Sequence, residues 1–125
     1  MQGYAAAEST LGRAYEKKKD YASAIFWYRK AADQEKVYAL YELGQMYRDG
    51  KGTAKDCVAA YALFTFASMS GEPINGNSDY PSTDSLAKCM TPAEVESGNT
   101  LHLEMKKIGV LRALDYHSEK RDGGN

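Results

Sequence analysis

The side chains of this chain that could carry out chemistry are few and widely spaced. The two histidines, His102 and His117, are not at the i, i+4 spacing that places two imidazoles around one metal ion on a helix. No G-x-S-x-G nucleophile motif, P-loop or dinucleotide-binding glycine motif occurs, and the acidic residues are scattered. We therefore expect no catalytic residue, no metal site and no cofactor, and we expect His102 at the edge of the core.

Cys57 and Cys89 are the only cysteines and allow two interpretations. A disulfide between them would close a loop of about 30 residues and stabilise the fold by about 3–4 kcal/mol in the chain-entropy model. Such a bond would indicate an oxidising compartment such as the bacterial periplasm, reached with a leader that this sequence does not contain at Met1. In the alternative they are unrelated thiols, and the protein is cytoplasmic.

The overall composition predicts one globular domain. The chain has 125 residues, of which 43% are hydrophobic and 26% charged. Its net charge of −1 provides no bulk attraction to nucleic acid or to an anionic membrane, so neither is expected as a partner. No apolar stretch approaches the roughly 20 residues that span a bilayer, so membrane insertion is not expected.

An internal repeat defines the elements that must position these residues. A shift of 32 residues aligns two copies of A-x-x-x-L-G-x-x-Y, namely Ala7, Leu11, Gly12 and Tyr15 with Ala39, Leu43, Gly44 and Tyr47. A shift of 36 aligns a second segment, namely Asp20, Ala24 and Ala31 with Asp56, Ala60 and Ala67. Apolar residues recur at helical spacing in each segment, so each copy predicts a pair of helices.

Glycine and aspartate have the same place in both copies. Gly12 and Gly44 each lie inside a predicted helix, where glycine costs roughly 1 kcal/mol relative to alanine. We therefore expect each glycine to permit close contact with a neighbouring helix. Asp20 and Asp56 each precede the second helix of their copy, and we expect them to be its N-cap residues.

The C-terminal part of the chain does not follow the repeat. Residues 71–90 are rich in glycine, proline, asparagine and serine and predict a long loop, which in a compact domain is usually functional or poorly ordered. Thr91 and Glu94 then have the spacing of a capping box. They predict a capping helix over about 91–117, followed by a flexible polar tail over 118–125. Gly109 is a candidate kink or end of this helix.

The repeated motif resembles the Sel-1-like repeat, a relative of the tetratricopeptide repeat. The resemblance covers repeat one at about 3–35 and repeat two at about 36–71. Repeat one lacks the G-x-G turn of repeat two, and Glu35 stands where the family has glycine. The resemblance implies an all-α fold: a right-handed α-solenoid of two helix-pair repeats plus a C-terminal capping helix. We expect these elements to form a single domain over 1–117.

The resemblance also implies a concave binding face lined by the first helix of each pair. Alignment of the Leu-Gly pairs with the related repeat places seven residues there: Ser9, Arg13, Glu16, Tyr38, Tyr41, Gln45 and Arg48. Tyrosine and arginine dominate binding hot spots, so we predict contact with another protein or peptide at this face and at loop 71–90. In the alternative these are ordinary solvated positions, and some tyrosines pack between the repeats.

The function predicted from this resemblance is non-catalytic protein–protein interaction. Bacterial members of the family act as adaptors, and some act as immunity proteins that bind and neutralise a cognate secreted toxin. Two alternatives stay open: a cell-envelope enzyme acting on β-lactams or peptidoglycan, and a scaffold that self-associates through exposed solenoid ends. Gln2-Gly3 resembles the end of a preceding repeat, so we also expect a fragment, or a mature form cleaved after its leader.

Overall fold

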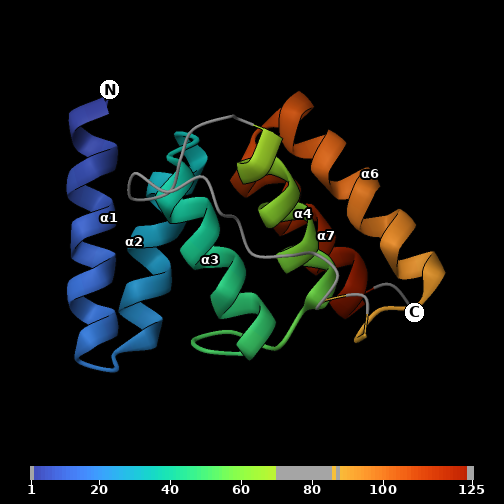
Figure 1. The fold of residues 1–125 in the computed structure, drawn as a ribbon, viewed down its shortest axis with the longest axis horizontal. Coiled ribbons are helices and arrows are strands. Elements are labelled where there is room, and N and C mark those ends of the chain that lie inside the picture. The colour runs from blue at the N-terminus through green and yellow to red at the C-terminus, as the bar shows by residue number, and fades with distance from the viewer. Residues whose placement is uncertain (1, 70–85, 87, 124–125) are drawn as a thin grey trace.

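The computed structural model describes residues 2–69, 86 and 88–123, and for 2–6 and 121–123 only the backbone. Within these residues the chain is helical and contains no strand, which confirms the predicted all-α class. The helices are shown in Figure 1: α1 (Gln2–Lys17), α2 (Tyr21–Asp33), α3 (Val37–Asp49), α4 (Cys57–Met69), α6 (Pro92–Ile108) and α7 (Val110–Gly123). None of the described helices is long and apolar enough to cross a membrane.

The helices form the successive pairs of an α-solenoid. Helix α1 packs against α2 and α3 against α4, while α2 also packs against α3 and α4 against α6. In Figure 1 the array runs from α1 at one end to α6 at the other. Because each interior helix is covered on two sides, the core lies between α2, α3 and α4, where Tyr28, Leu43 and Phe64 are almost completely buried.

The two repeated glycines permit close contact inside each helix pair, as predicted. A Cβ atom at Gly12 would lie 2.7 Å from Cδ1 of Tyr28, and one at Gly44 would lie 2.5 Å from Cε1 of Phe64. Both distances are shorter than carbon–carbon contact allows. The aromatic ring of the second helix therefore occupies the space of the missing side chain, and the motif has a direct packing reason.

The predicted N-cap residues are also confirmed. An Asp20 oxygen accepts a hydrogen bond from the backbone N–H of Ser23 at 3.2 Å, and Asp56 Oδ1 accepts one from Ala59 at 3.1 Å. Each bond satisfies a donor that the first turn of a helix leaves without an intrahelical partner. The second helix of each repeat is thus fixed at its start by the same residue type.

Residues 92–123 form two helices, where the sequence predicts one helix over 91–117 and a tail over 118–125. Helix α6 begins at the predicted capping box and ends at Gly109, whose φ of 100° turns the backbone out of the helix. Helix α7 then continues to Gly123. Asp33 of α2 accepts a hydrogen bond from the backbone N–H of Leu111 at 3.1 Å, so a distant residue supports the start of α7.

Polar contacts fix α7 across the second helices of both repeats. Arg29 of α2 donates to Asp115 at 2.5 Å and to the Tyr47 hydroxyl at 3.1 Å. His117 Nε2 lies 2.9 Å from the Asp56 carboxylate that also caps α4. Three apolar residues of α7 are buried beneath these contacts: Val110, Ala113 and Leu114. The last helix is therefore part of the packed structure.

Cys57 and Cys89 form a disulfide in the structure, with their Cα atoms 6.5 Å apart. The bond joins the first residue of α4 to the turn before α6. Most of the predicted loop 71–90, namely residues 71–85 and 87, lies outside the described residues. The described end of that segment is a turn over 88–89, and Leu86 and Met90 are buried in the core.

Candidate binding surface

Helices α1 and α3 carry all seven residues predicted for the concave face. The structure leaves Arg13 exposed and leaves five others half-buried: Glu16, Tyr38, Tyr41, Gln45 and Arg48. These six residues come from the first helix of each pair, as the repeat alignment requires. We call the surface that they form the α1–α3 surface.

Ser9 does not belong to the α1–α3 surface. Its side chain is only 5% exposed, and its hydroxyl has no hydrogen-bond partner within the described structure. The physical reason is helical geometry, because Ser9 lies one turn before Gly12 on the same side of α1. That side faces the Tyr28 ring of α2. The prediction of Ser9 as a contact residue is therefore corrected.

A tyrosine–carboxylate cluster lies at the centre of the α1–α3 surface. The hydroxyl of the buried Tyr28 donates a hydrogen bond to Glu16 at 2.8 Å. The Tyr28 ring also contacts the Tyr38 ring edge-to-face, with centroids 6.4 Å apart. Glu42 of α3 interacts with Glu16 and with Arg13 of α1, so the cluster connects the first helices of both repeats.

Electrostatics distinguish Glu42 from the other carboxylates of this surface. Burial, and then the neighbouring Glu16 carboxyl, raises the pKa of Glu42 to about 7, while the Arg13 guanidinium partly opposes this shift. Burial and Glu42 in turn raise the pKa of Tyr38. Two carboxyl groups that interact while partly removed from water resist carrying two negative charges. The charge of the cluster therefore changes near neutral pH.

The sequence prediction missed Glu42 and Tyr28, although one of them leaves a signal. Glu42 follows Tyr38 by four residues and precedes Gln45 by three, so helical spacing places it on the predicted face. Tyr28 belongs to the second helix of repeat one. Its role depends on the gap left by Gly12, which only the packed structure reveals.

The other half of the α1–α3 surface is built on α3 alone. The Tyr41 ring packs against Phe64, with ring centroids 6.0 Å apart, so its position is fixed by the core. Arg48 Nε donates to the adjacent Asp49 carboxylate at 3.0 Å. Tyr41 thus combines both interpretations of the tyrosines, since it packs inside the helix pair and is still half-exposed on the surface.

The surface suits binding more than bond-making chemistry. It offers rigid aromatic rings, two guanidinium groups and a pair of carboxyl groups. Elsewhere, His102 is buried against Phe66, and burial followed by Lys106 lowers the pKa of its imidazole. In the described parts of the chain no group of three histidine, cysteine, aspartate or glutamate side chains is arranged to hold a metal ion.

Comparison with known protein families gives two matches within the chain. Residues 6–36 and residues 37–72 each match the family model of the Sel1 repeat, and together they cover more than half of the chain. The first match contains the whole of α2 and most of α1, and the second contains α3 and α4. Searches of curated proteins and of solved structures found no match.

Proposed function

This chain belongs to the Sel1 repeat family, whose repeats generally mediate protein–protein interaction, and from that premise we propose that it is a non-catalytic adaptor that binds another protein through the α1–α3 surface. The observation that carries this proposal is the tyrosine–carboxylate cluster between α1 and α3. It places half-buried aromatic and charged side chains from both repeats on one continuous surface.

The geometry of the tyrosines supports a role in recognition. Tyr38 is held against Tyr28, and Tyr41 is held against Phe64. Rings that are already fixed lose little conformational entropy when a partner binds, and tyrosine supplies both apolar area and a hydrogen-bonding group. Arg13 of α1 and Arg48 of α3 add positive charge to the α1–α3 surface and suit partner carboxylates or backbone carbonyls.

A narrower form of the proposal names the kind of partner. In this form the protein is a bacterial immunity protein, and the α1–α3 surface covers a cognate secreted toxin. The Cys57–Cys89 disulfide supports an oxidising compartment such as the periplasm, where a secreted toxin would be met. The adaptor proposal does not depend on this narrower form.

The test is an affinity purification from cells of the source organism with a two-arginine variant and a matched control. The test variant is Arg13→Ala with Arg48→Ala, and the control is Lys107→Ala with Arg112→Ala, which removes two exposed charges from α6 and α7. We expect the test variant alone to reduce recovery of a stoichiometric partner at least about tenfold, as is usual for paired hot-spot residues. Equal recovery with both variants would remove the α1–α3 surface from the proposal.

The choice of arginine avoids a loss of folding. Tyr41→Ala would remove a ring that packs on Phe64, whereas Arg48 pairs only locally with its neighbour Asp49. Exposed ion pairs contribute little to stability, and Arg13 opposes only part of the pKa shift of Glu42, so the double variant should unfold with a midpoint close to that of the wild type. The recovered partner then decides the narrower form: growth arrest on its expression, relieved by co-expression of this protein, supports a toxin. A harmless partner leaves an adaptor and contradicts the immunity role.

A further inference from the structure

Helix α1 exposes the face that α3 buries. The three apolar positions Ala39, Leu43 and Met46 of α3 are at most 1% exposed, because α2 and α4 pack around them. Their equivalents at a shift of 32 residues, Ala7, Leu11 and Ala14, are all exposed, and Leu11 is 41% exposed. The repeat itself therefore shows which kind of neighbour fits α1, namely another helix laid along this stripe.

The stripe ends in positive charge. Lys17, the last residue of α1, follows Ala14 by three residues on the same side of the helix, and Lys18 begins the turn after α1. Both are exposed, and neither forms an ion pair with any residue that the structure describes. A partner surface for α1 must therefore be apolar in its middle and acidic at one side.

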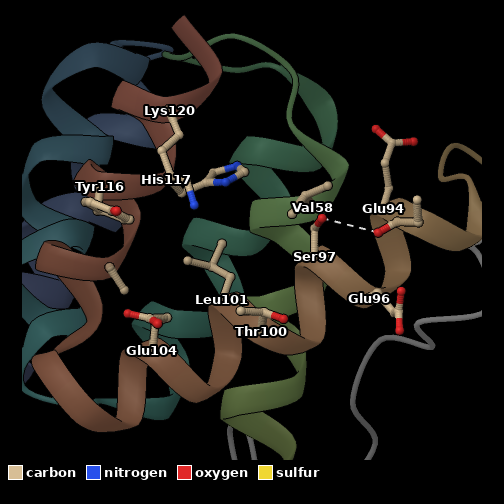
Figure 2. A pocket seen from close by; sticks show the side chains of 12 residues that line it. Val58, Glu94, Glu96, Ser97, Thr100, Leu101, Glu104, Tyr116, His117 and Lys120 are labelled. Carbon is tan, nitrogen blue, oxygen red and sulfur yellow. Dashed lines mark hydrogen bonds between the residues drawn. The ribbon is translucent and has the colours of Figure 1, made fainter. Parts of the chain in front are cut away.

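Such a surface lies at the other end of the molecule. A cleft of about 680 Å³ opens between α6 and α7, and its lining includes the largely buried Val58, Leu101 and Ala113. Figure 2 shows Val58 and Leu101 on its walls. Glu96 and Glu104 of α6 are among its lining residues; in Figure 2 Glu104 lies near Leu101, whereas Glu96 is at the outer edge and points away from the cleft. This volume lies in the range of about 300–1,000 Å³ that is typical of ligand sites, so it is large enough to receive several side chains of a helix.

Two basic side chains also line the cleft. His117 contacts the Asp56 carboxylate at 2.9 Å. The Lys120 ammonium lies 5.1 Å from the centroid of the Tyr116 ring, and that ring is 55% exposed at the cleft. Lys120 keeps its positive charge in this contact, but the lining also contains Glu94, Glu96 and Glu104, so the cleft has an excess of acidic groups, opposite in charge to the end of α1.

We propose that these two surfaces form one head-to-tail interface, in which the exposed stripe of α1 docks into the α6–α7 cleft of a second copy of the chain. Leu11 contacts the apolar wall, and Lys17 and Lys18 approach Glu96 and Glu104. The two surfaces lie at opposite ends of the array in Figure 1, so the contact is heterologous and can continue from copy to copy. This assembly uses a different side of α1 from the proposed partner surface.

The first test is sedimentation velocity of the full chain over a wide concentration range. We expect the average mass of the wild-type protein to rise with concentration. Leu11→Glu should weaken self-association at least about tenfold, since it puts an acidic group against an acidic cleft. The matched control is Leu103→Glu on α6, which replaces a leucine that is 55% exposed but does not line the cleft. A wild-type monomer at every concentration, or equal effects of both changes, would overturn the proposal.

The second test separates a head-to-tail contact from a symmetric one. A cleft variant with Glu96→Lys and Glu104→Lys keeps its own α1 intact, and Leu11→Glu keeps its own cleft intact. We expect each to be monomeric alone and their mixture to associate, because the intact α1 of the first fits the intact cleft of the second. Glu94 is left unchanged because it forms the capping box of α6. A symmetric α1–α1 contact would instead let the cleft variant associate like the wild type, and a monomeric mixture would also refute the interface.

Discussion

Helices α1 and α3 share the motif A-x-x-x-L-G-x-x-Y but bury different parts of it. In both helices the glycine contacts an aromatic ring of the following helix. The leucine differs: Leu43 is completely buried in α3, whereas Leu11 is 41% exposed in α1. The glycine thus makes its packing contact inside each helix pair, while burial of the leucine requires a helix that precedes the pair.

The motif therefore has two structural roles: the glycine pairs helices within a repeat, and the leucine packs one repeat against the next. Pairing within a repeat needs only residues of that repeat, so it is the same in both copies. Stacking between repeats needs a neighbour, and only α3 has α2 before it in the described chain. The same residue type therefore contributes several kcal/mol in one copy and very little in the other. Each prediction below alters one side of this comparison.

The largest expected effect comes from truncating the two leucines. Leu43→Ala should lower the free energy of unfolding by about 4 kcal/mol, because a fully buried leucine leaves a cavity in a packed core. Leu11→Ala should lower it by less than about 0.5 kcal/mol, because its side chain already contacts water. Urea denaturation followed by circular dichroism measures both. The measurement is made at high dilution, because the head-to-tail interface would cover Leu11 at high concentration. Similar losses at the two sites under these conditions would show that α1 is covered even in the single chain.

The second prediction concerns the disulfide, which repeat one lacks because it contains no cysteine. Replacing Cys57 and Cys89 by serine should cost about 3–4 kcal/mol, since the bond spans a sequence separation of 32 residues and restricts the unfolded chain. Thermal unfolding of this variant, with the wild type in reducing buffer as a control, measures the loss. An unchanged midpoint in both samples would mean that the two cysteines are not bonded in solution.

Much of the fold was predictable from local sequence signals. The helix pairs, the N-caps Asp20 and Asp56 and the contacts of Gly12 and Gly44 all follow from patterns within a few residues of one another. Such patterns act through hydrogen bonds and packing inside one repeat. The internal repetition strengthens them, because two copies of a costly glycine at one place indicate a common packing cause.

The remaining features depend on residues far apart in the sequence. Helix α7 begins beside Asp33 and is held by Arg29, and neither residue is near it in the chain. The alignment predicts Ser9 on the surface because it gives the position of Ser9 along α1 but not how closely that side of α1 packs against α2. Glu42 acquires its raised pKa because packing of the helices buries it and because α1 brings Glu16 beside it. Spacing alone gives neither distance nor burial.

The third prediction uses Glu42, which stands where repeat one has Thr10. The pKa of Glu42 is raised from 4.5 to about 7 by burial and by Glu16. Between pH 4.5 and about 7 the Glu42 carboxyl is therefore mostly protonated in the folded protein and mostly ionised in the unfolded chain. The stability that this proton provides is therefore lost as pH rises through about 7. Glu42→Gln removes this dependence and should be more stable than the wild type above pH 7, by about 1–2 kcal/mol after solvent screening.

The measurement for Glu42 is the difference in unfolding free energy between variant and wild type at several pH values. The difference should be small near pH 4 and should grow up to about pH 8. Glu96→Gln is the control, since it removes one carboxylate from an exposed position of α6. A difference that stays constant with pH would show that neither burial nor Glu16 raises the pKa of Glu42 in the folded protein.

The smallest expected effect concerns how α1 and α3 end. Helix α3 ends at Gly50 with a φ of 70°, whereas Lys19 follows α1 with a φ of 63°. The left-handed region costs a residue with a Cβ atom about 1–2 kcal/mol, and glycine avoids this cost. The greater conformational freedom of glycine in the unfolded chain offsets part of the resulting stabilisation. Lys19→Gly should therefore stabilise the protein by about 0.5 kcal/mol, and Gly50→Ala should destabilise it by about 1 kcal/mol. Opposite signs in thermal unfolding would establish that the two helices end in the same way with differently suited residues. Two changes of the same sign would mean that the turn after α1 adopts another conformation in solution, so the two helices would not end in the same way.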